Sequence, residues 1–478
     1  MSKRNKKEIQ FQDWLARMYP EDVKLDELKG LSEEERNKNS LYNLTRTVTF
    51  QVTDACNLAC KYCYQINKGH RRMPFETAKL FVDKLISGKD GFREYLGNSP
   101  GIILEFIGGE PFLEVDLIDK IVDYFREKCI QINHPWATKY CISICSNGVL
   151  YRDPKVQKFL QKNCHNISFS VTVDGTKELH DSCRVFPDGR PSYDLAHDAA
   201  MDWKHRGYDM GSKITISPGN IKYLHGALAQ MVDDGYDNIF ANCVYEKGWE
   251  EKHATELYKQ CKEISDDLEA RGIKKDEFYF SLLTKDWNKP MPESDNKNWC
   301  GGTGLMLAMD PDGRLYPCLR YMESSIGTDQ PPLLIGDVWN GIAQRQCEKD
   351  CVKCMDSITR RSQSTDECFY CPVASGCSWC SAYNYQIFGT QNKRTTFICE
   401  MHKAQGLAMV YYWNTYYKDH NIDDHVDLWC PRVWAEPIIG KEEYDKLAEL
   451  TKSLGGYVNE DKTEIHGYKE DGAKDRAS

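Results

Sequence analysis

The chain has no long apolar run. No window in it approaches the roughly eighteen consecutive apolar residues that a membrane-spanning helix needs. Its first residues, 1–7, are basic, but no apolar stretch follows them, as one would in a secretory signal. We therefore expect no membrane as a partner and a cytoplasmic location.

The chain also lacks an excess of basic residues. Its 62 lysines and arginines are outnumbered by 72 aspartates and glutamates, which gives a formal net charge of -10. Nucleic acids and anionic membranes attract proteins through positive charge, so no nucleic acid is expected as a partner. With 478 residues, 41% of them hydrophobic, the chain can bury a large core and form two or three domains.

Cysteine, in contrast, is abundant. The 21 cysteines are an odd number in a chain without a signal sequence, which favours metal ligation over a disulfide framework. Cys56, Cys60 and Cys63 share one short loop at Cys-x3-Cys-x2-Cys spacing. Three such thiolates can hold three irons of a [4Fe-4S] cube and leave the fourth iron open. On spacing alone, a zinc knuckle or three unligated thiols remain alternatives.

The position of this loop favours iron and sulfur. The loop directly follows the alternating run 46–52, which has the pattern of a β-strand. A second strand pattern, 102–106, runs into Gly108-Gly109-Glu110. Together the two loops resemble the radical S-adenosylmethionine (radical SAM) family.

That resemblance implies a set of cofactor contacts. The open iron would chelate the amino and carboxylate groups of SAM. Glu110 would accept a hydrogen bond from the ammonium group, while Gly108 and Gly109 would let the backbone approach closely. Tyr62 matches the aromatic position that flanks the adenine.

Strand patterns alternate with helical patterns along the chain, which is typical of parallel β/α architecture. Helical spacing predicts helices over 75–85, 117–125, 250–271 and 404–418. The six strand patterns are 46–52, 102–106, 140–146, 167–173, 213–217 and 238–244. The resemblance implies an α/β fold, the partial (β/α)6 TIM-like radical SAM barrel, in which function collects at the carboxyl ends of the strands.

Polar residues follow the third and fourth strand patterns. The resemblance implies that Ser146, with Asn147 in the same turn, serves the methionyl carboxylate of SAM, and that Thr172 serves the ribose. It also implies that Arg184 pairs with that carboxylate, for which a bidentate guanidinium is suited. Taken singly, Asn147, Gly148, Asp174 and Gly175 are better interpreted as ordinary turn residues.

A second dense cysteine region resembles the SPASM extension, an auxiliary iron-sulfur domain of radical SAM enzymes that modify peptides and proteins. One spacing departs from the usual pattern, because two residues rather than three separate Cys377 from Cys380. The resemblance implies one closed [4Fe-4S] cluster held by Cys368, Cys371, Cys377 and Cys399. It implies a second auxiliary cluster held by Cys300, Cys318 and Cys380.

The second auxiliary cluster has only three ligands in this assignment. Sulfatase-maturing relatives carry a fourth cysteine shortly after the first, but 301–306 contains none. A vacant iron resembles the thioether-forming maturases of the sactipeptide/ranthipeptide type that act on Cys-x3 repeat precursors, where it can bind a substrate cysteine. Cys347, Cys351 and Cys354 repeat the first spacing inside the extension. One of them could supply the missing ligand, or all three could be free thiols.

The predicted organisation has five parts. They are an N-terminal helical segment over 1–45, a radical SAM core over 46–245, a helical bridge over 246–296, a SPASM domain over 297–405, and a C-terminal helix and tail over 406–478.

The resemblance implies an enzyme with SAM and three [4Fe-4S] clusters, reduced by an external donor of the flavodoxin or ferredoxin type. Its substrate would be a ribosomally made, cysteine-containing precursor peptide, which loses hydrogen from carbon and gains a sulfur-to-carbon thioether. Alternatives are a formylglycine-forming maturase, a peptide epimerase or a carbon-carbon crosslinking enzyme. Outside that class stand an iron-sulfur electron carrier and a zinc-stabilised interaction protein. The Gly-Gly-Glu loop favours the enzyme, because a carrier needs no receptor for an amino group.

Overall fold

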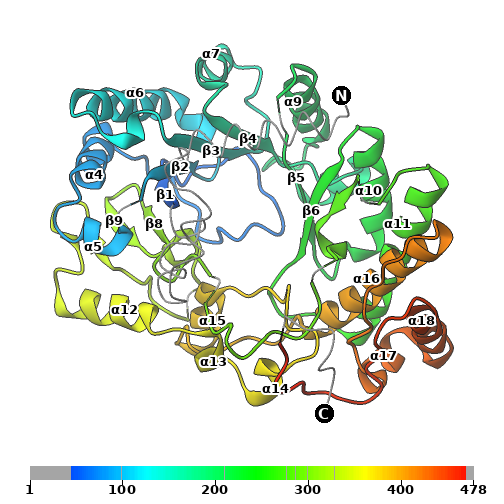
Figure 1. Cartoon of the computed structure of the whole chain (residues 1–478). Helices are drawn as coiled ribbons and strands as arrows, with labels where there is room; N and C mark the ends of the chain where they lie inside the picture. Colours follow the sequence, from blue (N-terminus) through cyan, green and yellow to red (C-terminus); the bar gives the residue numbers. More distant parts are fainter. Residues whose placement is uncertain are drawn as a thin grey trace. The chain divides into compact units, whose positions relative to one another are not determined.

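A computed structural model describes residues 45–97, 99–208, 210–275, 277–285, 287–298, 300–327 and 329–469. The helical segment predicted over 1–45 therefore lies, except for Thr45, outside the described residues, as does the end of the tail. The described residues form two compact units (Figure 1). No helix in the described ranges is long and apolar enough to cross a membrane.

The first unit contains the described residues up to Thr172, together with 183–210 and 300–357. Its eight-stranded sheet is built on four parallel strands, β1 to β4. Strand β8 adds to β1 in parallel, and β9 to β11 continue in antiparallel pairs. In spatial order the strands are β11 (Gly341–Ile342), β10 (Gly336–Asp337), β9 (Arg314–Tyr316), β8 (Met306–Met309), β1 (Thr45–Gln51), β2 (Gly101–Ile107), β3 (Tyr140–Ser146) and β4 (Ile167–Val171).

Helices of the first unit cover one face of this sheet, as Figure 1 shows for α4, α6 and α7. Side chains alternate along a strand, so apolar residues of β1 and β2 point together toward the helices. Phe50 pairs with Phe106 across the two strands, and the Phe50 ring lies 5.0 Å from that of Phe81 on α4. The helices are α4 (Phe75–Ser87), α5 (Phe92–Leu96), α6 (Val115–Gln131), α7 (Pro154–Asn163), α9 (Tyr193–His205) and α12 (Gln346–Asp356).

The second unit contains 173–182, 211–298 without its gaps, and 358–469. Its parallel sheet consists of β5 (Ser212–Ile216), β6 (Asn238–Cys243) and β7 (Tyr279–Phe280). Helix α11 (Glu251–Ala270) packs along α16 (Cys399–Asp419). The other helices are α8 (Lys177–Cys183), α10 (Leu224–Asp233), α13 (Arg360–Gln363), α14 (Asp366–Phe369), α15 (Ser381–Phe388), α17 (Arg432–Ile439) and α18 (Lys441–Ser453).

The predicted α/β fold with parallel strands is confirmed. All six predicted strands are present, and the four predicted helices correspond to α4, α6, α11 and α16. The strands divide between two sheets, β1 to β4 in the first unit and β5 and β6 in the second. The segment that opens the predicted extension forms β8, which extends the sheet of the core through β1.

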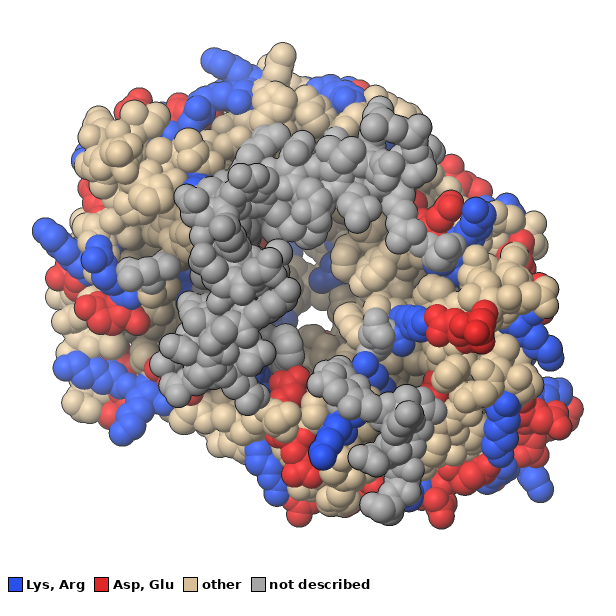
Figure 2. Space-filling model, in the orientation of Figure 1, with Lys and Arg blue, Asp and Glu red and all other residues tan. Residues whose placement is uncertain are grey.

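Charged side chains of both signs are interspersed over the face drawn in Figure 2. This distribution agrees with the mixed composition, in which acidic residues outnumber basic ones only modestly.

Candidate functional site

The two N-terminal motifs pack directly on each other in the first unit. The Gly109 amide donates to the Thr53 carbonyl at 3.1 Å, and the Glu110 amide donates to the Ala55 carbonyl at 2.9 Å. A Cβ atom at Gly109 would lie 2.3 Å from the Ala55 oxygen and 2.7 Å from the Cβ of Cys56. Only glycine permits this approach, so the Gly-Gly-Glu segment is fitted to the cysteine loop.

Glu110 is a buried carboxylate at the centre of this arrangement, with 1% of its surface exposed. Its Oε1 accepts from the Ser146 hydroxyl at 2.7 Å and from the Phe112 amide at 3.2 Å, and its Oε2 accepts from the Asn147 amide at 2.8 Å. Burial raises the pKa of Glu110, and these hydrogen bonds and Arg184 oppose the increase. A carboxylate offers about four acceptor directions, so one remains for a further donor.

Ser146 and Asn147, at the end of β3, therefore contact the Gly-Gly-Glu loop through the carboxylate of Glu110. The Ser146 hydroxyl also accepts from the Gly148 amide at 3.0 Å. The Asn147 side-chain amide donates to the Asn57 side chain of the cysteine loop at 2.6 Å. The loops that follow β1, β2 and β3 are thus joined by hydrogen bonds at one edge of the sheet.

Arg184 is brought to the cysteine loop by backbone pairing. The Ala59 amide donates to the Val185 carbonyl at 2.8 Å, and the Lys61 amide donates to the Cys183 carbonyl at 3.0 Å. The Arg184 guanidinium then donates to the Tyr62 hydroxyl at 2.8 Å. Tyr62, predicted to flank the adenine, and Arg184, predicted to pair with the carboxylate of SAM, are therefore in contact.

The three thiols of the loop are partly buried. Burial raises the pKa of Cys56, and the Leu58 amide, which donates to its sulfur at 3.4 Å, opposes this. Thr172 lies at the neighbouring strand end, where its amide donates to the Ser146 carbonyl at 3.0 Å. Its hydroxyl is 3.4 Å from the sulfur of Cys145.

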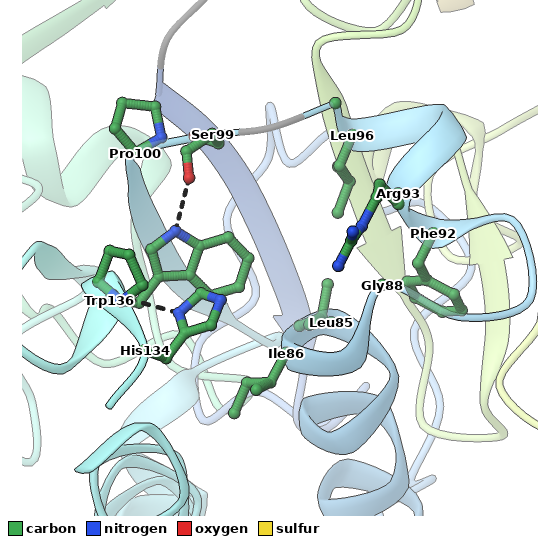
Figure 3. Close-up of a pocket in the computed structure, with 12 residues that line it drawn as sticks. Leu85, Ile86, Gly88, Phe92, Arg93, Leu96, Ser99, Pro100, His134 and Trp136 are labelled. Carbon is green, nitrogen blue, oxygen red and sulfur yellow. Dashed lines mark hydrogen bonds between the residues drawn. The ribbon is translucent and has the colours of Figure 1, made fainter. Parts of the chain in front are cut away.

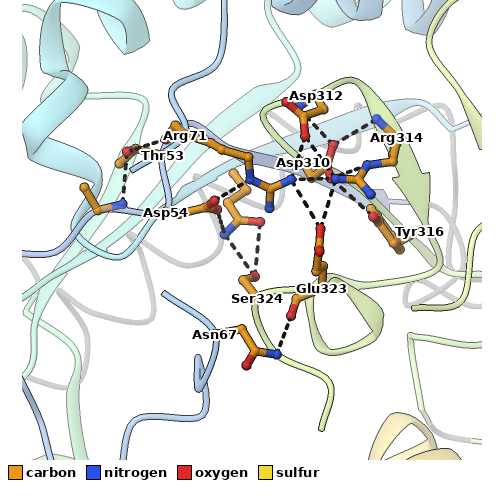
Figure 4. Close-up of polar contacts among 12 residues, drawn as sticks. Thr53, Asp54, Asn67, Arg71, Asp310, Asp312, Arg314, Tyr316, Glu323 and Ser324 are labelled. Atoms are coloured by element: carbon orange, nitrogen blue, oxygen red, sulfur yellow. Dashed lines mark hydrogen bonds and ion pairs between the residues drawn. The ribbon is translucent and has the colours of Figure 1, made fainter. Parts of the chain in front are cut away.

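An ionic network that sequence reasoning missed fixes the start of the cysteine loop (Figure 4). Arg71 binds the buried Asp54 through Nε at 2.5 Å and Asp312 through Nη1 at 2.6 Å. The Gln51 side-chain amide donates to Asp54 at 2.9 Å and to the Ser324 hydroxyl at 3.0 Å. This network ties the cysteine loop to the segment that follows Cys318.

Cys300 and Cys318 come together around a glycine. A Cβ atom at Gly302 would lie 3.0 Å from the sulfur of Cys318 and 3.6 Å from the sulfur of Cys300. A side chain there would fill the space between the two sulfurs. The pair therefore fits a shared sulfur-ligated group. Cys380 belongs to the second unit, where it precedes α15, so its part in this site stays a prediction.

Four further cysteines are gathered in the second unit. Cys371 lies within electrostatic reach of the three other thiols predicted to share a cluster with it, Cys368, Cys377 and Cys399. The set contains only thiols, which suits an iron-sulfur cube. In the described part of the chain, no three His, Cys, Asp or Glu side chains are close enough to bind a single metal ion.

Two basic residues accompany this group, and the cysteine motif gave no indication of either. The Arg394 guanidinium donates to the sulfur of Cys377 at 3.3 Å and to that of Cys368 at 3.5 Å. His402 follows Cys399 by one turn of α16. Burial opposes a thiolate at Cys377, but the charges of His402 and Arg394 outweigh it and lower the pKa of Cys377 to about 6.

A cavity of about 300 Å³ lies elsewhere in the first unit (Figure 3). Phe92, Arg93, His134 and Trp136 are among the residues that line it. It adjoins the segments that precede β2 and β3, at the strand edge opposite to Glu110 and Ser146. The cavity therefore lies away from the Gly-Gly-Glu loop.

Comparison with known proteins agrees with this arrangement. Residues 45–194 match a family described as a 4Fe-4S single cluster domain. An uncharacterized protein of Methanocaldococcus jannaschii, MJ0907, is 30% identical over 189 residues, which cover 40% of this chain and 59% of that protein. A serine-type anaerobic sulfatase-maturating enzyme of Bacteroides thetaiotaomicron is 24% identical over 181 residues, or 36% of this chain and 39% of the enzyme. The chain thus spans less than two thirds of the length of these relatives.

Solved structures show the same fold. The structure of anSMEcpe with bound AdoMet and the Cp18Cys peptide has a TM-score of 0.56 at 16% identity, over 79% of this chain and 99% of that one. SuiB of Streptococcus suis, bound to its precursor peptide SuiA, has a TM-score of 0.50 at 13% identity, over 75% and 77%. The fold is α/β, and residues 45–194 are similar to an iron-sulfur cluster domain. More particularly, parts of the chain are similar to radical SAM enzymes and to maturases.

Proposed function

We propose that this protein is a radical SAM peptide maturase that forms sulfur-to-carbon thioether crosslinks in a cysteine-containing precursor peptide. The observation that carries the proposal is Glu110. It is a buried carboxylate with an acceptor direction to spare, held against the cysteine loop by the Gly109 approach. An electron carrier has no need of such an acceptor.

The residues at the first site take distinct roles. Cys56, Cys60 and Cys63 would hold the catalytic [4Fe-4S] cluster, which when bound and reduced supplies the electron that cleaves SAM. Glu110 would accept from the ammonium of SAM through a charge-assisted hydrogen bond. Arg184, which contacts Tyr62, would face the carboxylate of the methionine part of SAM. These contacts would orient the cofactor.

The auxiliary sites complete the cofactor set. Cys368, Cys371, Cys377 and Cys399 would hold one [4Fe-4S] cluster, and Cys300, Cys318 and Cys380 would contribute to another. Arg394 offsets the negative charge of the four thiolates through its contacts with two sulfurs. An external donor of the flavodoxin or ferredoxin type would deliver the electron.

The names of the relatives support a peptide or protein substrate. They include a sulfatase-maturating enzyme and structures bound to peptides. A second candidate is the formylglycine-forming maturase. It is favoured by the sulfatase-maturating relative and by anSMEcpe, which aligns along 99% of its length. Against it, residues 301–306 lack the cysteine that the sulfatase-maturing relatives carry there.

Mass spectrometry of a precursor peptide encoded beside this protein separates the two candidates. The peptide is incubated anaerobically with reconstituted protein, SAM and reductant. Thioether formation lowers its mass by about two hydrogen atoms per bridge, and the change resists reducing agents. An aldehyde in place of a cysteine or serine side chain would support the second candidate. The Cys56→Ala/Cys60→Ala/Cys63→Ala variant is the control and should leave the peptide unchanged.

A further inference from the structure

A buried hydrogen-bond donor in the second unit has no acceptor. It is the indole nitrogen of Trp379, two residues after Cys377 of the four-cysteine group. Among the described residues, no other indole nitrogen is both buried and without a partner. The indole nitrogens of Trp136, Trp249 and Trp413, in comparison, each donate to a backbone carbonyl at 2.7–2.9 Å. An indole N–H can only donate, and buried donors are almost always paired, so the position of Trp379 indicates an acceptor nearby.

The guanidinium of Arg394 holds the Trp379 ring beside the four-cysteine group. Its Cζ atom lies 4.0 Å from the centre of the ring, which is a cation–π contact. The same guanidinium donates to the sulfur of Cys377 at 3.3 Å and to the sulfur of Cys368 at 3.5 Å. It also donates to the carbonyl of Cys377 at 3.2 Å. The indole ring and two of the four predicted ligand sulfurs therefore contact one planar group.

The backbone around Arg394 is fixed in turn. The Arg394 amide donates to the Gln363 carbonyl at 3.1 Å, and the Thr395 amide donates to the side chain of Asn384 on α15 at 2.9 Å. Asn384 and Gln363 are both buried. These contacts oppose any movement that would carry Arg394, and the ring packed on it, away from the thiols.

A [4Fe-4S] cluster would supply the kind of acceptor that this donor lacks. With four thiolate ligands the cluster is negatively charged, and its sulfurs accept hydrogen bonds from protein N–H groups. Trp379, Arg394 and the four cysteines all belong to the second unit, so donor and acceptor need nothing from the first. The residues present therefore fit a cluster at this place.

We propose that the indole N–H of Trp379 donates a hydrogen bond to a sulfide of the [4Fe-4S] cluster held by Cys368, Cys371, Cys377 and Cys399. The inference deepens the function proposed above and rests on it for the presence of that cluster. A hydrogen bond to a sulfur stabilises the reduced, more negative state, so Trp379 raises the reduction potential of the cluster. Thioether formation removes one hydrogen atom, one proton and one electron from the peptide, and a cluster of higher potential accepts that electron more readily.

Pulsed electron paramagnetic resonance tests the contact directly. The full chain is labelled with ¹⁵N at the indole nitrogen of tryptophan, reconstituted anaerobically and reduced. The wild type should show a ¹⁵N coupling to the reduced cluster, and Trp379→Phe, which keeps an aromatic ring against Arg394, should lose it. Trp413→Phe is the matched control, because it removes an indole N–H of the same unit that donates to a backbone carbonyl. It should keep the coupling. A wild-type spectrum without the coupling, or a coupling that survives in Trp379→Phe, would overturn the inference.

A redox titration measures the effect on the potential. It is run in the background that lacks the three cysteines of the first loop, so that only the auxiliary clusters contribute. Trp379→Phe should lower the potential of one cluster, so that its ratio of oxidised to reduced form at a fixed potential rises roughly tenfold, or about 59 mV for one electron. The same cluster should shift in Arg394→Met. No shift, or a shift confined to the other auxiliary cluster, would contradict the assignment.

Two further readouts separate the possible failures. Iron and sulfide per chain should be equal in the wild type and Trp379→Phe; if Trp379→Phe loses this cluster, the labelled wild type with Trp413→Phe as control still decides the contact. A wild-type protein that shows the ¹⁵N coupling but forms no 5′-deoxyadenosine would count against the proposed function alone. One that forms 5′-deoxyadenosine without the coupling would overturn the role of Trp379 alone.

Discussion

Two of the thiol sites, the Cys56 loop in the first unit and the four cysteines of the second unit, differ in the charge of a buried neighbour. The buried carboxylate of Glu110 lies beside Cys56, because Gly109 lets the two loops pack closely against each other. Beside Cys377 lie the cationic Arg394 and His402. A three-thiolate site with an acidic neighbour is complementary to a cationic ligand, whereas a four-thiolate site with basic neighbours balances the charge of a closed cluster. Under the proposed function, the charge beside each site, more than the cysteine count, would separate a reaction site from an electron-storage site.

Gly109→Ala should break the first site and leave the second intact. The added Cβ would lie 2.3 Å from the Ala55 carbonyl, and backbone cannot move aside as a flexible side chain can. Such overpacking costs about 1–3 kcal/mol or more and would displace Glu110 from the cysteine loop. We expect 5′-deoxyadenosine formation to fall at least about 100-fold, which corresponds to about 2.8 kcal/mol. Gly226→Ala is the control, because nothing lies within 4 Å of its added Cβ; equal activity of the two variants would refute the packing argument.

Glu110→Gln should weaken the first site without removing it. The amide keeps the size of the side chain but loses the charge and one acceptor, so SAM should bind roughly 10- to 100-fold more weakly. Equilibrium binding of SAM to the reconstituted protein measures the change. Glu105→Gln is the matched control, since Glu105 lies on β2, the strand that leads to Glu110, and accepts from Thr49 instead. A larger loss of SAM affinity in Glu105→Gln than in Glu110→Gln would contradict the assignment of Glu110 as the acceptor for the ammonium of SAM.

Arg394→Met should alter the second site alone. Hydrogen bonds to cluster sulfurs help set reduction potentials, and Arg394 supplies two of them together with a positive charge. Its loss should lower the potential of that cluster by roughly 60 mV, a tenfold change for a one-electron couple. A redox titration followed by paramagnetic resonance detects the shift. Arg361→Met, an arginine that pairs with the exposed Asp366, should give no shift.

The two sites should also differ in thiol reactivity when the protein is free of iron. The pKa of Cys377 is about 6, so its thiolate, the reactive form, predominates at pH 7 and is lost as the pH falls through 6. The pKa of Cys56 is raised by burial, so its reactivity should continue to rise above neutral pH. Brief alkylation at pH 5 and pH 7.5, read by mass spectrometry, compares the two. Faster labelling of Cys56 than of Cys377 at pH 7.5 would reverse the predicted order.

Much of the first site was predictable from the sequence for a physical reason. Parallel strands place their carboxyl ends at one edge, so a cysteine loop after 46–52 and a Gly-Gly-Glu loop after 102–106 had to lie near each other. The same reasoning placed Ser146 at that edge. Its contact with Glu110 was not predictable, because it depends on side-chain geometry across two loops.

Other features carry no local pattern. Arg71 and Asp312 are 241 positions apart, and each alone has the character of a surface charge. The pairing of β8 with β1 joins segments that the family resemblance assigned to different domains. Arg394 lies outside the cysteine spacing that predicted the auxiliary site, so only its position beside two sulfurs reveals its role.

The most direct test of the account is SAM cleavage by the reconstituted, reduced protein under anaerobic conditions, with 5′-deoxyadenosine measured by mass spectrometry. The account predicts that the wild-type chain forms it and that the Cys56→Ala/Cys60→Ala/Cys63→Ala variant forms none while keeping its auxiliary iron. Formation of 5′-deoxyadenosine by the triple variant at the wild-type rate would contradict the central claim.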